Sequence, residues 1–167
     1  YPFNTVKTFD YDRLLFGSTG SRPGVFWCNI NPNQQLRFVY DSNGVSVILT
    51  GGTVPNLSWS RITIRWNTSG VACFINGVLV ASDPRLITAI SGAVLHIGSY
   101  STQYYANILI DDLRISNRAR TDAEILAAYQ SGQPLAADEW TTYKLDFDDK
   151  VRITTQGQIV CNELIEI

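Results

Sequence analysis

Two adjacent aspartates are the residues of this chain whose position most calls for a chemical explanation. Asp111 and Asp112 stand in the segment ILIDDLRIS, which has the apolar pattern of a β-strand. Because side chains alternate along a strand, Asp111 shares a face with Leu109 and is expected to point into the core. Asp112 takes the other face, where we expect it to be exposed and to pair with a neighbouring arginine.

A carboxylate buried at position 111 needs a partner, because an unpaired one costs several kcal/mol. Asp111 could bind a metal ion. Alternatively, it could accept backbone N–H groups at a strand bend, or pair with Arg118 or Arg120. Neither role is catalytic.

The remaining acids and the histidine do not form a catalytic pattern. A retaining glycoside hydrolase needs two carboxylates about 5 Å apart, and the motif Glu-x-Asp-x-x-Glu that presents them on a strand is absent. The single histidine, His96, lacks a neighbouring serine or cysteine nucleophile and is expected to be a satisfied or surface residue. We therefore expect this protein not to be an enzyme. The four glutamates all lie in the C-terminal part of the sequence, at Glu124, Glu139, Glu163 and Glu166.

The segment SYSTQYYAN, residues 99–107, combines aromatic rings with amides, which together can recognise a sugar by stacking and hydrogen bonding. The alternative is that Tyr104 and Tyr105 simply begin the next strand. The ligand-binding residues predicted here are Tyr100, Gln103, Tyr104, Tyr105 and Asn107. Further candidates at the rim are Asp12, Arg13, Arg22 and Asn43, the last more typical of a plain turn.

The composition describes an ordinary globular domain. The chain has 167 residues, 45% of them hydrophobic, and a net charge of -2. Its Lys and Arg residues are scattered, so we expect no nucleic-acid partner. Its apolar runs are far shorter than the roughly 20 residues of a membrane-spanning helix, so we expect no membrane partner either.

The three cysteines, Cys28, Cys73 and Cys161, are too widely spaced for a zinc site or a small disulfide framework. Cys28 and Cys73 lie in apolar strand patterns and are predicted to be buried free thiols, with a bridge as the alternative.

Short β-type runs separated by turns recur from residue 12 to residue 116, which predicts an all-β, antiparallel β-sandwich. Asn76-Gly77 predicts a two-residue type I′ hairpin, and the turn at 67–70 extends it to a three-stranded meander. In the first strand of that meander Ile62 and Ile64 are expected to face the core and Arg65 the solvent. The tryptophans Trp27, Trp59 and Trp66 are interpreted as core residues.

One short helix is predicted after residue 121. Thr121 and Glu124 form a capping box, and Gly132 can end the helix in a left-handed conformation. Behind the cap runs an apolar stripe of Ile125, Leu126 and Tyr129.

Several of these segments together resemble the laminin G-like, concanavalin A-like jelly-roll family. The resemblance is carried by IRWNTSGVACFINGVLVAS, LHIGSY and ILIDDLRISNRARTDAEILAAY. It implies a sandwich domain over 1–132, followed by a linker at 133–140. The tail strands of 141–167 are expected to complete the sheet, with a following module or strand exchange as alternatives. The helix and SGQPLAADEWTTYKLDFD also resemble minor structural proteins of phage tails.

The family resemblance implies a non-catalytic carbohydrate-binding or adhesion module, extracellular or on a virion, whose partner is a surface glycan. The alternative is a purely structural module of a phage tail that contacts copies of itself or neighbouring virion proteins. Related sandwiches also bind a structural Ca²⁺ through an aspartate at the like position. This implies Asp111 as a calcium ligand, with Asp148 or Asp149 supplying a second acid.

The expected calcium ion can be tested by a thermal melt of the purified chain in EDTA and then in excess Ca²⁺. An ion that binds only the folded chain raises Tm by mass action, and Asp111→Ala should abolish the increase. A Tm that calcium leaves unchanged would instead assign Asp111 to hydrogen bonding.

Overall fold

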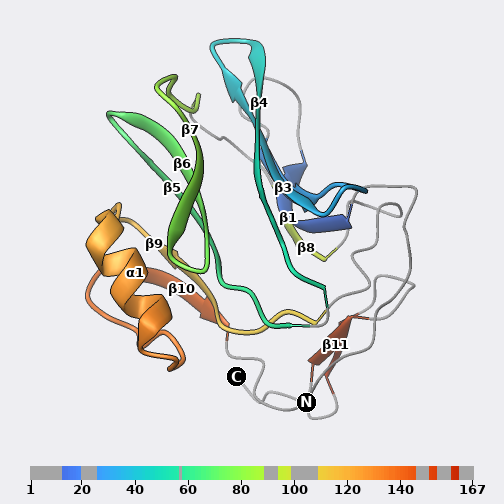
Figure 1. Cartoon of the computed structure of the whole chain (residues 1–167), viewed down its shortest axis with the longest axis vertical. Coiled ribbons are helices and arrows are strands. Elements are labelled where there is room, and N and C mark those ends of the chain that lie inside the picture. Colours follow the sequence, from blue (N-terminus) through green and yellow to red (C-terminus); the bar gives the residue numbers. More distant parts are fainter. Residues whose placement is uncertain are drawn as a thin grey trace.

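The computed structural model describes residues 13–19, 26–56, 58–88, 94–98, 109–145, 151–153 and 159–161. Antiparallel strands form two main sheets, which confirms the predicted all-β sandwich (Figure 1). The five-stranded sheet has the order β4-β3-β2-β1-β8 and the three-stranded sheet the order β5-β6-β7. The first consists of β1 (Arg13–Thr19), β2 (Phe26–Ile30), β3 (Gln35–Ser42), β4 (Val45–Thr53) and β8 (Val94–Ile97). The second consists of β5 (Ile62–Asn67), β6 (Gly70–Ile75) and β7 (Val78–Asp83).

Among the C-terminal elements, the helix packs on the outer face of the three-stranded sheet. β9 (Leu113–Ser116) precedes the helix α1 (Asp122–Gln130), and β10 (Thr141–Leu145) pairs with β9 in a two-stranded sheet. A hairpin of β11 (Val151–Ile153) and β12 (Ile159–Cys161) follows. The first tail strand thus pairs within its own chain, whereas the predicted domain boundaries stay a prediction.

Two Asn-Gly turns set the register of the hairpins. Asn76 and Gly77 have φ values of 52° and 79°, as a type I′ turn requires, so this predicted hairpin is confirmed. Asn43 and Gly44 repeat the geometry between β3 and β4 with φ values of 52° and 80°. Asn43, a rim candidate in the sequence, is therefore a turn residue.

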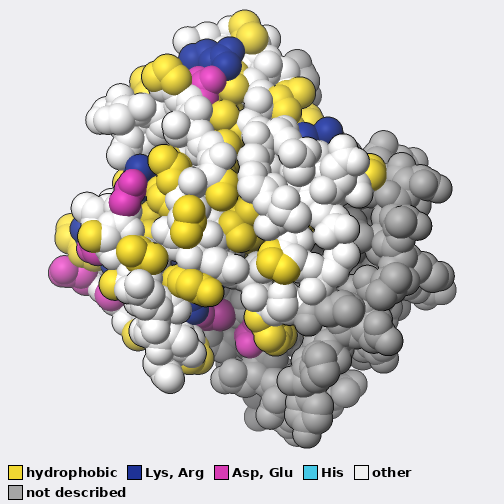
Figure 2. All heavy atoms as spheres, in the orientation of Figure 1, with side chains coloured by type: hydrophobic (Ala, Val, Ile, Leu, Met, Phe, Trp, Pro, Cys, Tyr) yellow, Lys and Arg dark blue, Asp and Glu magenta, His cyan; other side chains and the backbone are white. Residues whose placement is uncertain are grey.

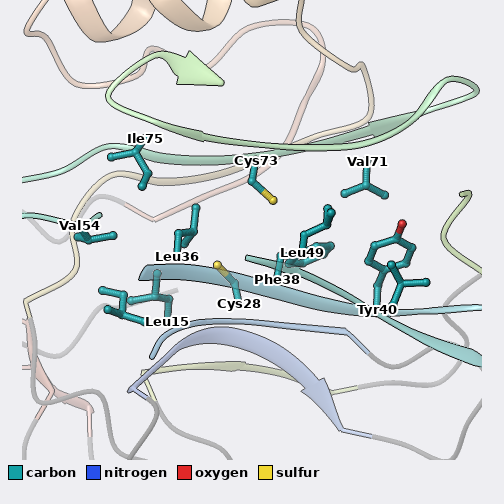
Figure 3. Close-up of a cluster of buried hydrophobic side chains, with 12 residues drawn as sticks. Leu15, Cys28, Leu36, Phe38, Tyr40, Leu49, Val54, Val71, Cys73 and Ile75 are labelled. Atoms are coloured by element: carbon teal, nitrogen blue, oxygen red, sulfur yellow. The ribbon is translucent and has the colours of Figure 1, made fainter. Parts of the chain in front are cut away.

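The core lies between the two sheets. Figure 3 shows Val71, Cys73 and Ile75 of β6 pointing toward Leu36 and Phe38 of the facing sheet, and all five belong to one buried cluster. Each fully buried side chain of this size contributes roughly 1.5–3 kcal/mol of hydrophobic stabilisation.

The phenol of Tyr40 reaches the edge of this core. Its hydroxyl donates to the Arg85 carbonyl at 3.2 Å and to Asp83 Oδ1 at 3.3 Å. Desolvation, followed by the nearby Asp83 charge, raises the pKa of Tyr40 to about 12.

The two cysteines predicted to be buried free thiols are confirmed as such. They face each other across the sandwich from β2 and β6 (Figure 3). Burial raises the pKa of Cys28 well above its ordinary value and that of Cys73 to about 12. Both thiols therefore stay neutral and behave as small apolar side chains.

The sheets come closest where β4 crosses β7. A Cβ on Gly51 would lie 2.2 Å from the Val80 carbonyl oxygen, so only glycine allows the two backbones to touch. Gly52, at φ 63°, lies beside the bulge in the β3–β4 register, and a Cβ there would meet the Ile75 and Val80 side chains. This contact closes one side of the sandwich.

The helix α1 follows the prediction at both ends. Thr121 and Glu124 form the reciprocal capping box, and Gly132 has φ 63°. Ile125 is buried against Ala72 and Phe74 on the outer face of the three-stranded sheet. Leu126 and Tyr129 are 38% and 41% exposed, so only one residue of the predicted stripe is core.

Three predictions about packing were wrong. Trp59 and Trp66 are 58% and 46% exposed because they lie at the rim of the sandwich, whereas Trp27 is half-buried. The arginine face of β5 is only partly open to solvent, because α1 lies beside Arg61 and Arg65. The strand around the aspartates begins only at Leu113, since residues 109–112 are irregular.

No helix in the described ranges is long and apolar enough to span a membrane.

The glycine contact predicts a stability difference between two substitutions. Gly51→Ala should destabilise the fold by about 3 kcal/mol, because the backbone of β7 must move to admit the methyl group. Gly44→Ala introduces strain at φ 80° but meets no atom, so we expect a loss of about 1–2 kcal/mol. Urea unfolding measures both, and equal losses would contradict the close crossing of β4 and β7.

Candidate functional site

The predicted ligand loop lies outside the described residues. Tyr100, Gln103, Tyr104, Tyr105 and Asn107 all fall there, as do Asp12, Arg22, Asp148 and Asp149. For Arg13 the structure describes the backbone in β1 but not the side chain. The described functional candidates are therefore the aspartates at 111 and 112 and the surfaces around the three-stranded sheet.

The two aspartates have the reverse of the expected burial, whereas the expected pairing of Asp112 with a neighbouring arginine is confirmed. Asp111 is exposed, and its Oδ1 accepts the backbone N–H of Asp112 at 2.7 Å. Asp112 is the protected residue, with a side chain 15% exposed. The alternation argument was wrong because these residues precede the strand, and Asp112 has a left-handed φ of 54°.

Asp112 holds the segment that follows α1. Its Oδ2 accepts the Leu135 backbone N–H at 2.7 Å and lies 3.5 Å from Arg61 Nη2. Arg61 also donates to the Gln133 carbonyl at 3.0 Å and to the Ala128 carbonyl. The predicted linker at 133–140 is therefore bound to the sandwich.

Arg61 belongs to a larger group that we term the arginine cluster. Its guanidinium groups connect β5, β9 and the following turn to α1 and residues 133–140. Arg118 pairs with Glu124, Arg120 pairs with Asp138, and Arg114 Nη1 donates to the Ala136 carbonyl at 2.8 Å. The cluster comprises Arg61, Arg65, Arg114, Arg118 and Arg120.

Two carboxyl groups in the cluster are stabilised as anions. The Thr121 backbone N–H and then Arg118 lower the pKa of Glu124 to about 2. Arg120 and then the Thr141 hydroxyl lower the pKa of Asp138 to about 2. Burial, followed by the charge of Arg120, lowers the pKa of Arg114.

A hollow of about 210 Å³ lies where β5, β6 and β7 end on the outer side of their sheet. We term it the outer-face hollow. The register places Arg65, Ala72 and Ser82 side by side across the three strands. Its lining residues are Arg65, Asn67, Ser69, Gly70, Val71, Ala72, Ser82, Asp83 and Pro84.

The hollow has a fixed cation in its wall. The Arg65 guanidinium carbon lies 5.1 Å from the centroid of the Phe74 ring, and Nη1 donates to the Arg120 carbonyl at 3.1 Å and to Asp122. Asp83 is already engaged, because Arg85 Nε donates to its Oδ1 at 2.8 Å and Nη2 to its Oδ2 at 2.6 Å. These bonds hold the pKa of Asp83 well below its usual range.

The described residues contain no group of three or more His, Cys, Asp or Glu that could hold a metal ion. Asp111, the described candidate ligand, is exposed, so burial no longer argues for an ion there. Calcium stays a prediction that depends on the family resemblance.

The described glutamates have positions without an evident catalytic role. Glu124 is part of the helix cap, and Glu139 lies in an exposed turn. His96 is half-buried in β8, opposite Gly17 of β1.

Comparison with known proteins agrees with this architecture. The family model described as "Concanavalin A-like lectin/glucanases superfamily" matches residues 4–126, more than half of the chain. The chain belongs to this concanavalin A-like superfamily. This match confirms the family that was predicted from the hairpin and IDDLRIS segments. It does not test the predicted likeness to phage tail proteins.

Among solved structures, the concanavalin A-like chain is similar to an S-layer domain-containing protein from Clostridium thermocellum, residues 221–444. The identity is 18% over 77% of this chain and 68% of that one, with a TM-score of 0.42. No curated protein matches the chain.

Sequence reasoning missed the outer-face hollow. The signal was available in part, because pairing the predicted meander places Arg65 beside Ala72 and Ser82, two small residues that leave space next to a guanidinium group. What the pattern did not indicate was that α1 would cover the rest of this face.

The arginine cluster predicts a loss of stability in acid. The folded-state pKa of Glu124 is about 2, below its ordinary value of 4.5, so its contribution is present above pH 4.5 and is lost as pH falls toward 2. Urea midpoints between pH 5 and about 2 should decline, and Glu124→Gln should decline less steeply. A variant with the unchanged slope would contradict the role of this carboxylate.

Proposed function

We propose that this concanavalin A-like domain is a non-catalytic carbohydrate-binding or adhesion module that acts at an extracellular or virion surface. The observation that carries the proposal is the outer-face hollow, which joins a positioned guanidinium group to small polar side chains on the rigid ends of three strands. Sites on strands hold their geometry better than sites on loops.

The chemistry of the hollow suits a polyhydroxyl ligand. Arg65 contributes donors, Ser69 and Ser82 contribute hydroxyls, and Asn67 contributes an amide. A hollow of about 210 Å³ with several polar side chains in its lining suits a small polar ligand better than a long apolar one.

Two exposed tryptophans provide further support for glycan binding. Trp66 is the residue before Asn67, the last residue of β5, and Trp59 lies in the connection before that strand. Exposed indole rings are costly in water and are suited to stack against the C–H faces of sugars. Because Trp66 and Arg65 are adjacent strand residues on opposite faces, the end of β5 offers two distinct contact surfaces.

A second candidate function is structural, as a module of a phage tail that binds copies of itself or neighbouring virion proteins. The β9–β10 ribbon favours it, because a sheet of only two strands is marginal alone. Tyr143 on this ribbon is 47% exposed and could be covered in an assembly. The resemblance of the helix and tail to phage tail proteins supports the same location.

The two functions are separated by a glycan array followed by titration of any ligand found. We expect saturable binding that Ser82→Leu abolishes, because a branched side chain there fills the outer-face hollow. Ser46→Leu is the matched control, since Ser46 is an exposed serine on β4 in the other sheet.

A protein that binds no glycan but forms an oligomer, as measured by light scattering, would replace the first function with the second. Glycan binding that both leucine variants retain would place the ligand outside the hollow.

A further inference from the structure

The carboxylate that pairs with Arg65, that of Asp122, indicates which class of ligand the hollow would bind. Nη1 of Arg65 makes both contacts, one with the Arg120 carbonyl and one with the Asp122 carboxylate. A guanidinium group carries five N–H donors in a planar fork that matches a carboxylate. Arg65 therefore has donor capacity beyond those two contacts, at the wall of the hollow.

The Asp122 carboxylate is easily replaced. Its side chain is 61% exposed, whereas that of Arg65 is only 19% exposed and lies against Phe74. An ion pair with one exposed partner contributes little to stability, so rotation of Asp122 into solvent costs little. The Arg65 guanidinium group is therefore held in place by its surroundings, whereas the Asp122 carboxylate is not.

The charges around the hollow then favour an acidic ligand. Arg65 and Asp122 cancel, and so do Arg85 and Asp83, which hold each other through two side-chain bonds. When Asp122 rotates into solvent, the Arg65 guanidinium group loses its direct contact with a carboxylate. A ligand that bears a carboxylate replaces this contact, and a neutral ligand does not.

We propose that the outer-face hollow binds a carboxylate-bearing sugar, of the uronate type, whose carboxylate replaces Asp122 on Arg65. The sugar hydroxyls bond to Ser69, Ser82 and Asn67 at the ends of the strands. Asp122 acts as a built-in competitor that occupies the guanidinium group when the ligand is absent. The inference rests on the proposed function and specifies its ligand.

The experiment is an NMR titration of the whole chain with sodium glucuronate, with its neutral methyl ester, and with glucose. The expected result is that glucuronate shifts the resonances of the hollow and the two neutral sugars do so much more weakly. Ser82→Leu should abolish the shifts.

Asp122→Asn is the decisive variant because it removes the competitor. Its Kd for glucuronate should be about two- to fivefold lower, the range expected for loss of an exposed ion pair. Glu139→Gln changes the net charge equally at an exposed turn and should leave Kd unchanged. Urea unfolding checks that each variant folds.

Equal binding of glucuronate and its ester, or an Asp122→Asn variant that binds glucuronate no more tightly, would overturn the inference. The comparison of acid and ester on the unaltered chain keeps the test valid if Asp122→Asn does not fold. If the inference fails in this way but the chain binds a glycan in the array, the proposed function still stands. If the chain binds no glycan at all, both the inference and the proposed function are contradicted.

Discussion

Burial of one ring, Phe74, holds the helix that follows the sandwich in the sequence. Phe74 points away from the main core, on the outer face of the three-stranded sheet, and yet it is 1% exposed. Ile125 of α1 covers it and the Arg65 guanidinium group lies over its face. Burying a ring of this size is worth roughly 1.5–3 kcal/mol, more than the exposed ion pairs around it. The apolar contact thus holds α1 on the sheet, and the arginine cluster fixes its orientation.

The same contact explains why the hollow on the outer face lies where it does. Figure 2 shows hydrophobic side chains in the region where Figure 1 places β7 and α1, with acidic and basic side chains next to one another at the margin of this region. The helix begins at Asp122, beside Arg65, and its later residues lie near the Asn76-Gly77 turn, where Leu126 contacts Gly77. The opposite ends of the strands, beyond Ala72 and Ser82, are left uncovered. The position of the helix cap therefore decides which part of this face stays open to solvent.

The elements with strong local signals could be predicted from the sequence. Asn76-Gly77 needs two residues at positive φ, and Thr121 with Glu124 makes reciprocal bonds within one turn, so neither depends on distant contacts. The tryptophans were misplaced because hydrophobic type alone does not reveal that Trp66 lies beyond the last covered row of the sandwich. To predict the candidate site, one needs the pairing of β5 with β6 and β7 and also the position of α1. The position of α1 depends on tertiary contacts, which the local sequence does not reveal.

Asp111 and Asp112 illustrate a different limit. The alternation that assigned Asp111 to the core holds only while the backbone is extended, and a single left-handed residue reverses the direction of the side chains that precede it. Asp112 tolerates that conformation at small cost because a short polar side chain can bond locally. The carboxylate of Asp112 then accepts the Leu135 backbone N–H and pairs with Arg61, rather than pointing into the core.

The pairing of β1 with β8 has a consequence for how the chain acquires its structure. Phe16 is aligned with Ile97, so the five-stranded sheet joins residues about eighty positions apart, whereas β5, β6 and β7 pair only with immediate neighbours. Contacts between neighbours form quickly, and contacts across long loops form slowly. During synthesis the meander can be complete while β1 is paired with β2 but still lacks its second partner, β8. Until β8 leaves the ribosome, the exposed edge of β1 is the part of the chain most open to pairing with another molecule.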